Sequence, residues 1–231
     1  MNFAEFQKQF KAEAYDRYRV RMSFEKLSGG TPAAPDLIAS WINSTNKERS
    51  AEERKALVDA TIAELPELSG EKEEKSWVRF KRDDDGAYIE GRCLKAALKE
   101  SANVVKTLVK VRGKNGEEEG AKALKSKVAE CVFVEETKIP ILNSDGKRVT
   151  GEIPSEDRPV HVMTRQGPRT SLKRSEVIHG ARIEFSVLLA KTGAVSENAL
   201  FSAIAYLEHL GVGADRSQGS GRSVEINVEK I

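Results

Sequence analysis

The chain has 231 residues, of which 39% are hydrophobic and 32% are charged, and its formal net charge is only +2. This length fits one large domain or two small ones, and any surface for nucleic acid has to arise from local segregation of basic residues. The cysteines, Cys93 and Cys131, have no metal-type spacing, and no apolar run approaches the roughly 20 residues that cross a bilayer. We therefore expect a cytoplasmic chain without a disulfide scaffold, cofactor, metal or membrane partner.

Residues 1–14 carry Phe3, Phe6 and Phe10 at the spacing of one helix face, which predicts an amphipathic helix. Such an aromatic stripe needs an apolar surface to cover it. We expect the helix to pack on its own domain rather than on a neighbouring subunit.

Residues 15–27 alternate between apolar and polar side chains, which predicts a half-buried strand. The open face of this strand carries Arg17, Arg19 and Arg21. A solvated strand commonly shows mixed charge, so three arginines together favour a surface that contacts phosphate.

A mainly helical insertion is predicted over 28–75, where Pro35 opens one helix and a second follows over about 51–65. Acidic residues outnumber basic ones between residues 47 and 75, so we assign this insertion no role in binding nucleic acid. After it, three aspartates and Gly86 join two short apolar segments and predict the turn of a hairpin. Consecutive carboxylates diverge on such a turn, which argues against a metal site.

Residues 91–99 begin the next predicted helix, with Leu94, Ala97 and Leu98 on one face and Lys95 and Lys99 off it. Beyond this helix, a strand is predicted over 128–135. Lysines on an exposed helix face are ordinary in any protein, so this segment gains its interest only from the motif considered below.

An extended or hairpin insertion is predicted over 138–175, because prolines and a Ser-Asp-Gly146 turn interrupt the segment. Between residues 158 and 175 the chain has several basic residues and no acidic one. This concentration of charge favours a polyanionic ligand, and the lack of aromatic residues favours phosphate contacts over base stacking. The basic residues are Arg158, Arg165, Arg169, Lys173 and Arg174.

The C-terminal part predicts a strand over 181–189, a helix capped by Ser196, and a last strand over 223–228. The loop between this helix and the last strand has the pattern Gly-x-Gly, five residues, Gly-x-Gly. Glycines permit positive φ angles and a concave run of backbone amides that suits a phosphate, and two arginines add charge. These residues are Gly211, Gly213, Arg216, Gly219, Gly221 and Arg222.

This loop resembles the glycine-rich loop of the RAMP superfamily of CRISPR-associated proteins, in which Gly-x-Gly, about five residues often including a basic one, and Gly-x-Gly lie near the C-terminus. Residues 91–99 resemble a second RAMP motif, Pro-Gly-Ser-Ser-Leu-Lys-Gly-Ala-Leu-Arg, at the head of the first helix. The matches are Gly91, Leu94, Lys95, Ala97 and Leu98, with Lys99 in the place of the usual arginine. Arg92, Cys93 and Ala96 depart from the motif, which marks a divergent member most similar to the Cas-seven backbone branch.

The resemblance implies an α+β fold of the ferredoxin-like type, similar to RNA-recognition domains. Such a fold has a split βαβ antiparallel sheet with two helices on one face. The predicted order, strand, helix, strand, strand, helix, strand, agrees with it. We thus expect a single domain over 1–231 that contains the insertions at 28–75 and 138–175, the second of them thumb-like.

The function that the resemblance implies is that of a guide-RNA-binding backbone subunit of a CRISPR effector complex, which holds single-stranded RNA by its sugar-phosphate chain. The expected partners are guide RNA (crRNA), further copies of the chain in a filament, other effector subunits, and target RNA or DNA. Lys95, Arg216 and the glycines follow from the motifs, and the other basic residues follow from charge alone. The predicted RNA-binding residues are Arg17, Arg19, Arg21, Lys95, Lys99, Arg165, Arg169, Lys173, Arg174, Gly211, Gly213, Arg216, Gly219, Gly221 and Arg222.

Two alternatives remain open from the sequence. The chain is an endoribonuclease of the same superfamily, or it is a single-stranded nucleic-acid-binding protein outside CRISPR systems, for example one encoded by a phage. Guide-processing enzymes use a histidine as general base, but no histidine lies near the first strand or first helix. Asp36 is the candidate for cleavage of target RNA, although a carboxylate in the first turn of a helix is also favoured by the helix dipole.

Overall fold

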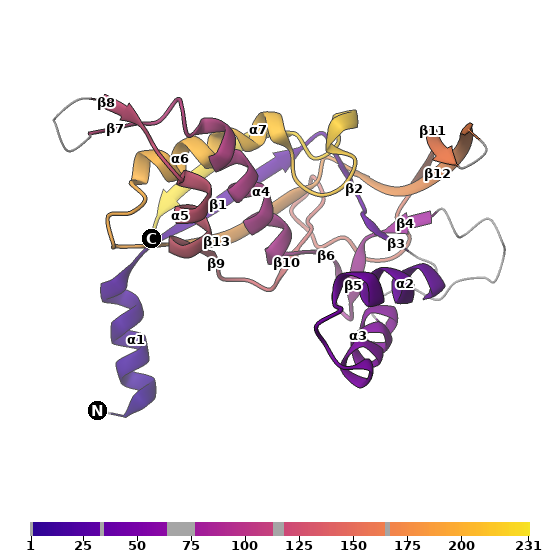
Figure 1. Ribbon diagram of the computed structural model, residues 1–231, viewed down its shortest axis with the longest axis horizontal. Helices are drawn as coiled ribbons and strands as arrows, with labels where there is room; N and C mark the ends of the chain where they lie inside the picture. The colour runs from indigo at the N-terminus through magenta and orange to yellow at the C-terminus, as the bar shows by residue number, and fades with distance from the viewer. Residues whose placement is uncertain (1, 33–34, 64–76, 113–117, 165–166) are drawn as a thin grey trace.

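The computed structural model describes residues 2–32, 35–63, 77–112, 118–164 and 167–231 of the chain. These residues form a mixed α+β structure, as the sequence predicts, around a four-stranded antiparallel sheet with the order β14-β1-β13-β9 (Figure 1). The strands are β1 (Tyr15–Phe24), β9 (Val132–Val134), β13 (Arg182–Ala190) and β14 (Ser223–Lys230).

One face of this central sheet forms the core. Alternate residues of β1 and β13 are buried, and the register places Val20 opposite Phe185. Two helices, α4 (Gly91–Val105) and α6 (Glu197–Ala205), cover this face (Figure 1). α6 begins where the sequence predicts, because the Ser196 hydroxyl accepts a hydrogen bond from the Ala199 N–H at 3.2 Å. The opposite face of the sheet carries the polar residues that alternate with the core.

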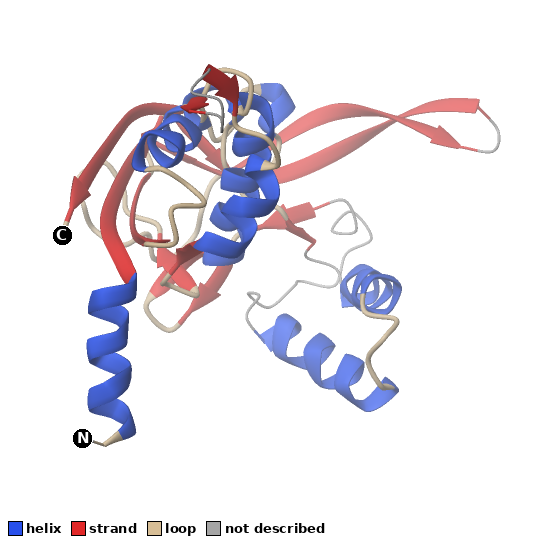
Figure 2. Ribbon diagram, turned by 60° about the vertical axis from the view of Figure 1, so that its left-hand side comes forward, coloured by secondary structure: helices blue, strands red, loops and turns tan. Residues whose placement is uncertain are grey.

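The N-terminal helix α1 (Phe3–Ala14) leads directly into β1 and projects away from the body (Figures 1 and 2). Phe3, Phe6 and Phe10 are 76%, 52% and 50% exposed, and no residue of α1 is buried. The expected helix is therefore present. The expectation that it packs on its own domain is wrong for the described residues, because the chain continues straight from helix to strand and carries the aromatic stripe away from the core.

A long hairpin extends from the other side of the body, opposite α1 (Figure 2). It pairs β11 (Ser155–Thr164) with β12 (Gly167–His179). The C-terminal part of β12 also pairs with two short strands, β2 (Lys26–Ser28) and β4 (Trp77–Arg79), so the base of the hairpin is joined to the body by strand pairing.

A buried carboxylate reinforces this base. Glu176 of β12 accepts hydrogen bonds from the Phe80 N–H at 2.8 Å and from the Arg82 guanidinium at 2.7 Å. Burial raises the pKa of Glu176, although the Phe80 amide and the two arginines Arg82 and Arg79 oppose that shift. These contacts orient the hairpin relative to the sheet at the point where it leaves the body.

The remaining elements surround this framework. The predicted turn at Gly86 is confirmed, since it joins two antiparallel strands. The strand predicted over 128–135 begins only at Val132, because Leu124, Val128 and Cys131 recur at helical spacing and are buried as one face of a helix. No helix among the described residues is long and apolar enough to cross a membrane. The helices and strands not yet named are β3 (Thr31–Pro32), α2 (Pro35–Thr45), α3 (Ala51–Ala63), β5 (Lys81–Asp83), β6 (Gly86–Glu90), β7 (Lys110–Arg112), β8 (Glu118–Gly120), α5 (Leu124–Cys131), β10 (Lys138–Pro140) and α7 (Leu207–Leu210).

Candidate nucleic-acid interface

The glycine-rich loop, residues 211–222, runs from α7 to β14 and contains a single 3₁₀ turn, Arg216–Gln218. Its glycines all have positive φ, as the sequence predicts; the values are 77° at Gly211, 81° at Gly213, 84° at Gly219 and 72° at Gly221. Asp215 also has a positive φ of 58°, which is uncommon for a residue with a side chain. The loop is therefore a tightly shaped structure with five positive φ angles.

The glycines do not share one role. A Cβ on Gly221 would lie 1.8 Å from the Val212 carbonyl oxygen, so this glycine lets the two ends of the loop approach each other. A Cβ on Gly213 would point inward, 3.4 Å from the Ser28 carbonyl oxygen. A Cβ on Gly219 would meet nothing within 4 Å. Gly219 is consequently the glycine whose missing side chain leaves space on the outer surface of the loop.

The loop offers a run of hydrogen-bond donors. Among the residues that the structure describes, the backbone N–H groups of residues 213–217 have no hydrogen-bond acceptor, whereas those of Gly211, Val212, Gln218, Gly219 and Gly221 are bonded within the fold. Successive unbonded amides in a turn of this kind form a concave site for an anion. Phosphate oxygens have the charge and the acceptor capacity that such a site requires.

The basic hairpin lies against this loop. Asp215 forms ion pairs with Arg158 of β11 and with Lys173 of β12, the latter at 2.8 Å, and its other oxygen accepts a hydrogen bond from the Ser175 hydroxyl at 3.3 Å. Burial tends to raise the pKa of Asp215, but the hydrogen bonds and charges of Lys173 and Arg158 hold it below its usual range. The glycine-rich loop and the basic hairpin, which are identified separately from the sequence, are thus joined by the Asp215 carboxylate.

The loop also contacts α4, because Arg216 forms an ion pair with Glu100 at 2.6 Å. A cavity of about 460 Å³ is lined by Gly213 and Ala214 of the loop and by Ala97 of α4, together with residues of β3, α2, α3, β5 and β6. Apolar and charged residues both line this cavity, among them Phe80, Tyr88, Glu90 and Arg92. The two motifs that resemble RAMP proteins therefore border the same cavity.

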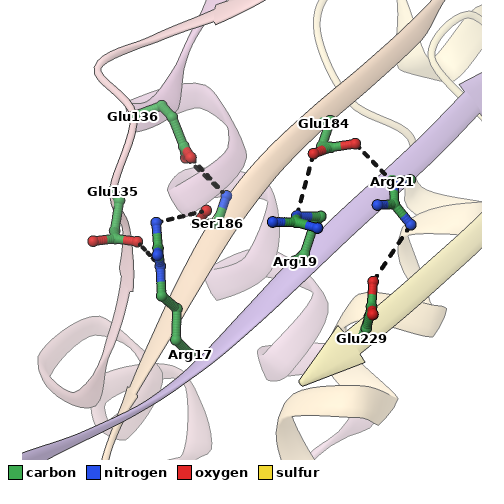
Figure 3. A network of polar contacts seen from close by, with 8 residues as sticks. All are labelled: Arg17, Arg19, Arg21, Glu135, Glu136, Glu184, Ser186 and Glu229. Atoms are coloured by element: carbon green, nitrogen blue, oxygen red, sulfur yellow. Dashed lines mark hydrogen bonds and ion pairs between the residues drawn. The ribbon is translucent and has the colours of Figure 1, made fainter. Parts of the chain in front are cut away.

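The predicted arginine face of β1 is exposed, as expected, but each arginine is paired with an acid (Figure 3). Arg17, Arg19 and Arg21 are 51%, 38% and 47% exposed. Ion pairs this exposed are held weakly, so they can exchange for phosphate. The acidic partners, from the end of β9, from β13 and from β14, are Glu135, Glu184 and Glu229.

Two residues of the motif over 91–99 have roles within the fold. A Cβ on Gly91 would lie 1.9 Å from the Glu136 carbonyl oxygen, so only glycine fits at the head of α4. The Lys95 ammonium donates to the carbonyl oxygens of Val128, Ala129 and Val132 at the C-terminal end of α5. Burial, and to a lesser extent the Lys99 charge, lowers the pKa of Lys95 to about 8. The prediction that Lys95 contacts RNA stays a prediction, and that contact would require these bonds to break.

The other predicted RNA-binding residues are placed as follows. Lys99 is half-exposed and Arg222 is exposed. Neither residue has an ion-pair partner among the described residues. Arg174 pairs with Asp157 across the hairpin at 2.7 Å. Arg165 and the side chain of Arg169 lie outside the described part of the chain.

Sequence reasoning missed an aromatic residue beside the hairpin. Trp77 of β4 lies in parallel register with Arg174 of β12, and the guanidinium carbons of Arg79 and Arg174 are 3.6 and 5.6 Å from its ring centre. The hairpin sequence itself has no such residue, and nothing in the sequence links Trp77 to it. Only the pairing of β4 with β12 brings an aromatic ring to the basic strand.

Asp36 is the candidate for cleavage of target RNA, and the histidines are assigned no catalytic role. α2 begins at Pro35, so Asp36 lies in its first turn, and its side chain is outside the described part. His179 contacts Glu156 at 3.2 Å, His209 is exposed on α7, and the side chain of His161 is not described. No group of three or more potential metal ligands occurs among the described residues.

No family model matches the chain, and no curated protein does. Among solved structures, the chain is similar at 11% identity and a TM-score of 0.44 to a chain of the type III-B Cmr-beta bound to cognate target RNA, with 99% of this chain and 65% of that chain covered. It is also similar, at 11% identity and a TM-score of 0.43, to a chain of a type IV-B CRISPR complex, with 93% and 90% covered. The chain thus spans less than two thirds of the first of these.

Proposed function

We propose that the chain binds single-stranded RNA by its sugar-phosphate backbone and serves as a guide-RNA-binding backbone subunit of a CRISPR effector complex. The observation that carries this proposal is the meeting of three segments. The glycine-rich loop is joined by Asp215 to the basic hairpin and by Arg216 to α4. These are the segments that the sequence marks by motif or by charge, and their contacts bring basic residues and the loop amides into one region, which suits a phosphate chain.

The topology of the central sheet supports the same proposal. In the chain, α4 lies between β1 and β9, and α6 lies between β13 and β14, while the strand order is β14-β1-β13-β9. A ferredoxin-like, split βαβ arrangement has this order of strands and helices. We therefore assign the chain to that fold, with α2, α3 and the β11–β12 hairpin as insertions.

Recognition on this surface is independent of base sequence. The unbonded N–H groups of residues 213–217 donate hydrogen bonds to phosphate oxygens, and the nearby cations neutralise phosphate charge. Lys99 and Arg222 need not give up an ion pair among the described residues to do so. Such binding follows the RNA backbone and weakens with salt, because each neutralised phosphate releases bound counterions.

Assembly is the second part of the proposal. α1 presents three exposed phenylalanines and contributes no residue to the core. A helix of twelve residues is marginal in water without packing on an apolar face. We propose that this face packs on another copy of the chain or on another effector subunit, as polymerisation along a guide requires.

The proposal is tested with a fluorescein-labelled oligouridine of about 12 nucleotides, a length that one RNA-binding domain covers. Binding is measured by fluorescence anisotropy over a range of salt concentrations. Arg216→Gln is compared with Arg148→Gln, which removes the same charge from ion pairs with Asp83 and Asp85 and lies outside the predicted RNA-binding residues. We expect Arg216→Gln alone to reduce the log–log salt slope by about 0.7. Equal slopes for the two variants, or no binding by the native chain, would refute the proposal. The labelled RNA is also recovered and sized, and specific cleavage products would favour the endoribonuclease instead.

A further inference from the structure

Arg158 and Lys173 are directly opposite each other across the β11–β12 hairpin. Like charges in this position repel, so a hairpin that places two cations side by side is destabilised unless an anion lies between them. Ser175 follows Lys173 by two residues and therefore lies on the same face of the strand. The hairpin thus presents two positive charges and a hydroxyl on one surface, which is the donor set of an anion site.

In this structure the anion is a side chain of the protein. One oxygen of Asp215 contacts both Arg158 and Lys173, and the other accepts from Ser175. The Asp215 side chain is 12% exposed, and its backbone is held at a φ of 58°. The loop therefore adopts an unfavourable backbone angle at the residue whose carboxylate enters the site.

A phosphodiester group resembles this carboxylate in the properties that matter here. Each carries one negative charge, and each offers two oxygens that accept hydrogen bonds. Asp215 also stands within the run of unbonded amides, residues 213–217. A phosphate at this position would accept from the two cations and the Ser175 hydroxyl that now hold Asp215, beside a loop whose amides have no acceptor of their own among the described residues.

We propose that Arg158, Lys173 and Ser175 form a subsite for one phosphodiester group of single-stranded RNA, and that Asp215 occupies this subsite until the RNA displaces it. The inference rests on the proposed RNA-binding function and adds a competitor that belongs to the chain. Free protein keeps its cations neutralised, and RNA gains the subsite only by moving an acidic side chain out of it.

The test is a substitution that should improve binding. Asp215→Asn keeps the shape of the side chain, and asparagine tolerates positive φ better than most residues. We expect the variant to bind the oligouridine about tenfold more tightly than the native chain, equivalent to about 1.4 kcal/mol. Asp215→Gly, which relieves the backbone angle as well, should also bind more tightly and serves if the asparagine variant unfolds.

Two comparisons separate this effect from a general gain in positive charge. Asp83→Asn removes the same charge from the Asp83–Arg148 pair and should leave RNA affinity unchanged. In the background Arg158→Gln with Lys173→Gln, the Asp215→Asn substitution should give no gain, because the subsite is absent.

The outcomes distinguish this inference from the proposed function. If the native chain binds RNA and Asp215→Asn binds no more tightly than Asp83→Asn, the subsite is refuted and the proposed function stands. A gain that persists without Arg158 and Lys173 also refutes the subsite. If Asp215→Asn binds RNA and the native chain does not, the proposed function of the native chain is refuted, whereas competition by Asp215 for the subsite is supported. If no variant binds, both ideas are overturned.

Discussion

Gly219→Ala tests whether the outer surface of the glycine-rich loop contacts RNA. The added methyl group would meet no atom of the protein within 4 Å, but it would stand in the open space beside the loop. The strain of a side chain at a φ of 84° costs about 1–2 kcal/mol. For a chain of this size that strain lowers the melting temperature by only about 2–4 °C per kcal/mol.

The expected effect on RNA binding is larger. Excluding a phosphate from one charge-assisted hydrogen bond costs about 1.5–3 kcal/mol. Affinity should therefore fall roughly 10- to 150-fold. The assay is oligouridine binding by fluorescence anisotropy, with thermal unfolding measured on the same samples.

Gly193→Ala is the matched control. Gly193 has a φ of 75°, and a methyl group added there would also meet no atom within 4 Å, but it lies in the turn before α6. The two variants should lose similar stability, and only Gly219→Ala should lose RNA affinity. Equal affinities would show that the loop is a turn with no ligand on this surface.

Three further predictions concern the stability of the fold. Gly221→Ala should lower the unfolding free energy by about 2–4 kcal/mol in urea denaturation, because its methyl group would overlap the Val212 carbonyl, and a loss under 1 kcal/mol would contradict this. Lys95→Met should cost about 1–3 kcal/mol in the same assay, since it leaves carbonyls at the end of α5 without a donor, and an unchanged midpoint would contradict that role. The pKa of Asp215 is lowered in the folded chain, so its contribution to stability is complete above the ordinary value of 3.8 and is lost as the pH falls through the lower folded value. Acid unfolding of Asp215→Asn should accordingly depend less on pH in that range, and an identical profile would show that the ion pairs add nothing.

Local patterns in the sequence predict much of the framework. Alternation predicts β1 and β13, the phenylalanine spacing predicts α1, and Ser196 predicts the start of α6. The glycine pattern predicts the positive φ angles of the loop, because few other residues adopt them. These features depend on neighbours within a few residues, so a single sequence contains the information.

The sequence does not predict which charged residues form ion pairs in the folded chain. The arginines of β1 read as an open basic face, yet their partners come from strands more than a hundred residues away (Figure 3). Asp215 reads as one polar residue of a loop, and only the packing of the hairpin gives it Arg158 and Lys173. Ion pairing between distant segments depends on the fold as a whole, so the sequence of one segment does not identify its partner residues in another.

The junction between α1 and β1 has a mechanical consequence. β1 pairs with β13 from Tyr15 to Ser23 and with β14 from Tyr18 to Phe24, so it is bonded along both edges. α1 continues from this strand without a loop, since the Tyr15 N–H still donates to the Lys11 carbonyl at the end of the helix. A pull on α1 along the strand would load both ladders in shear, and their bonds would have to break together. A partner bound to this helix is therefore connected directly to the central strands of the sheet. Under tension we expect the helix to unwind before the strands separate, because its hydrogen bonds are loaded one after another.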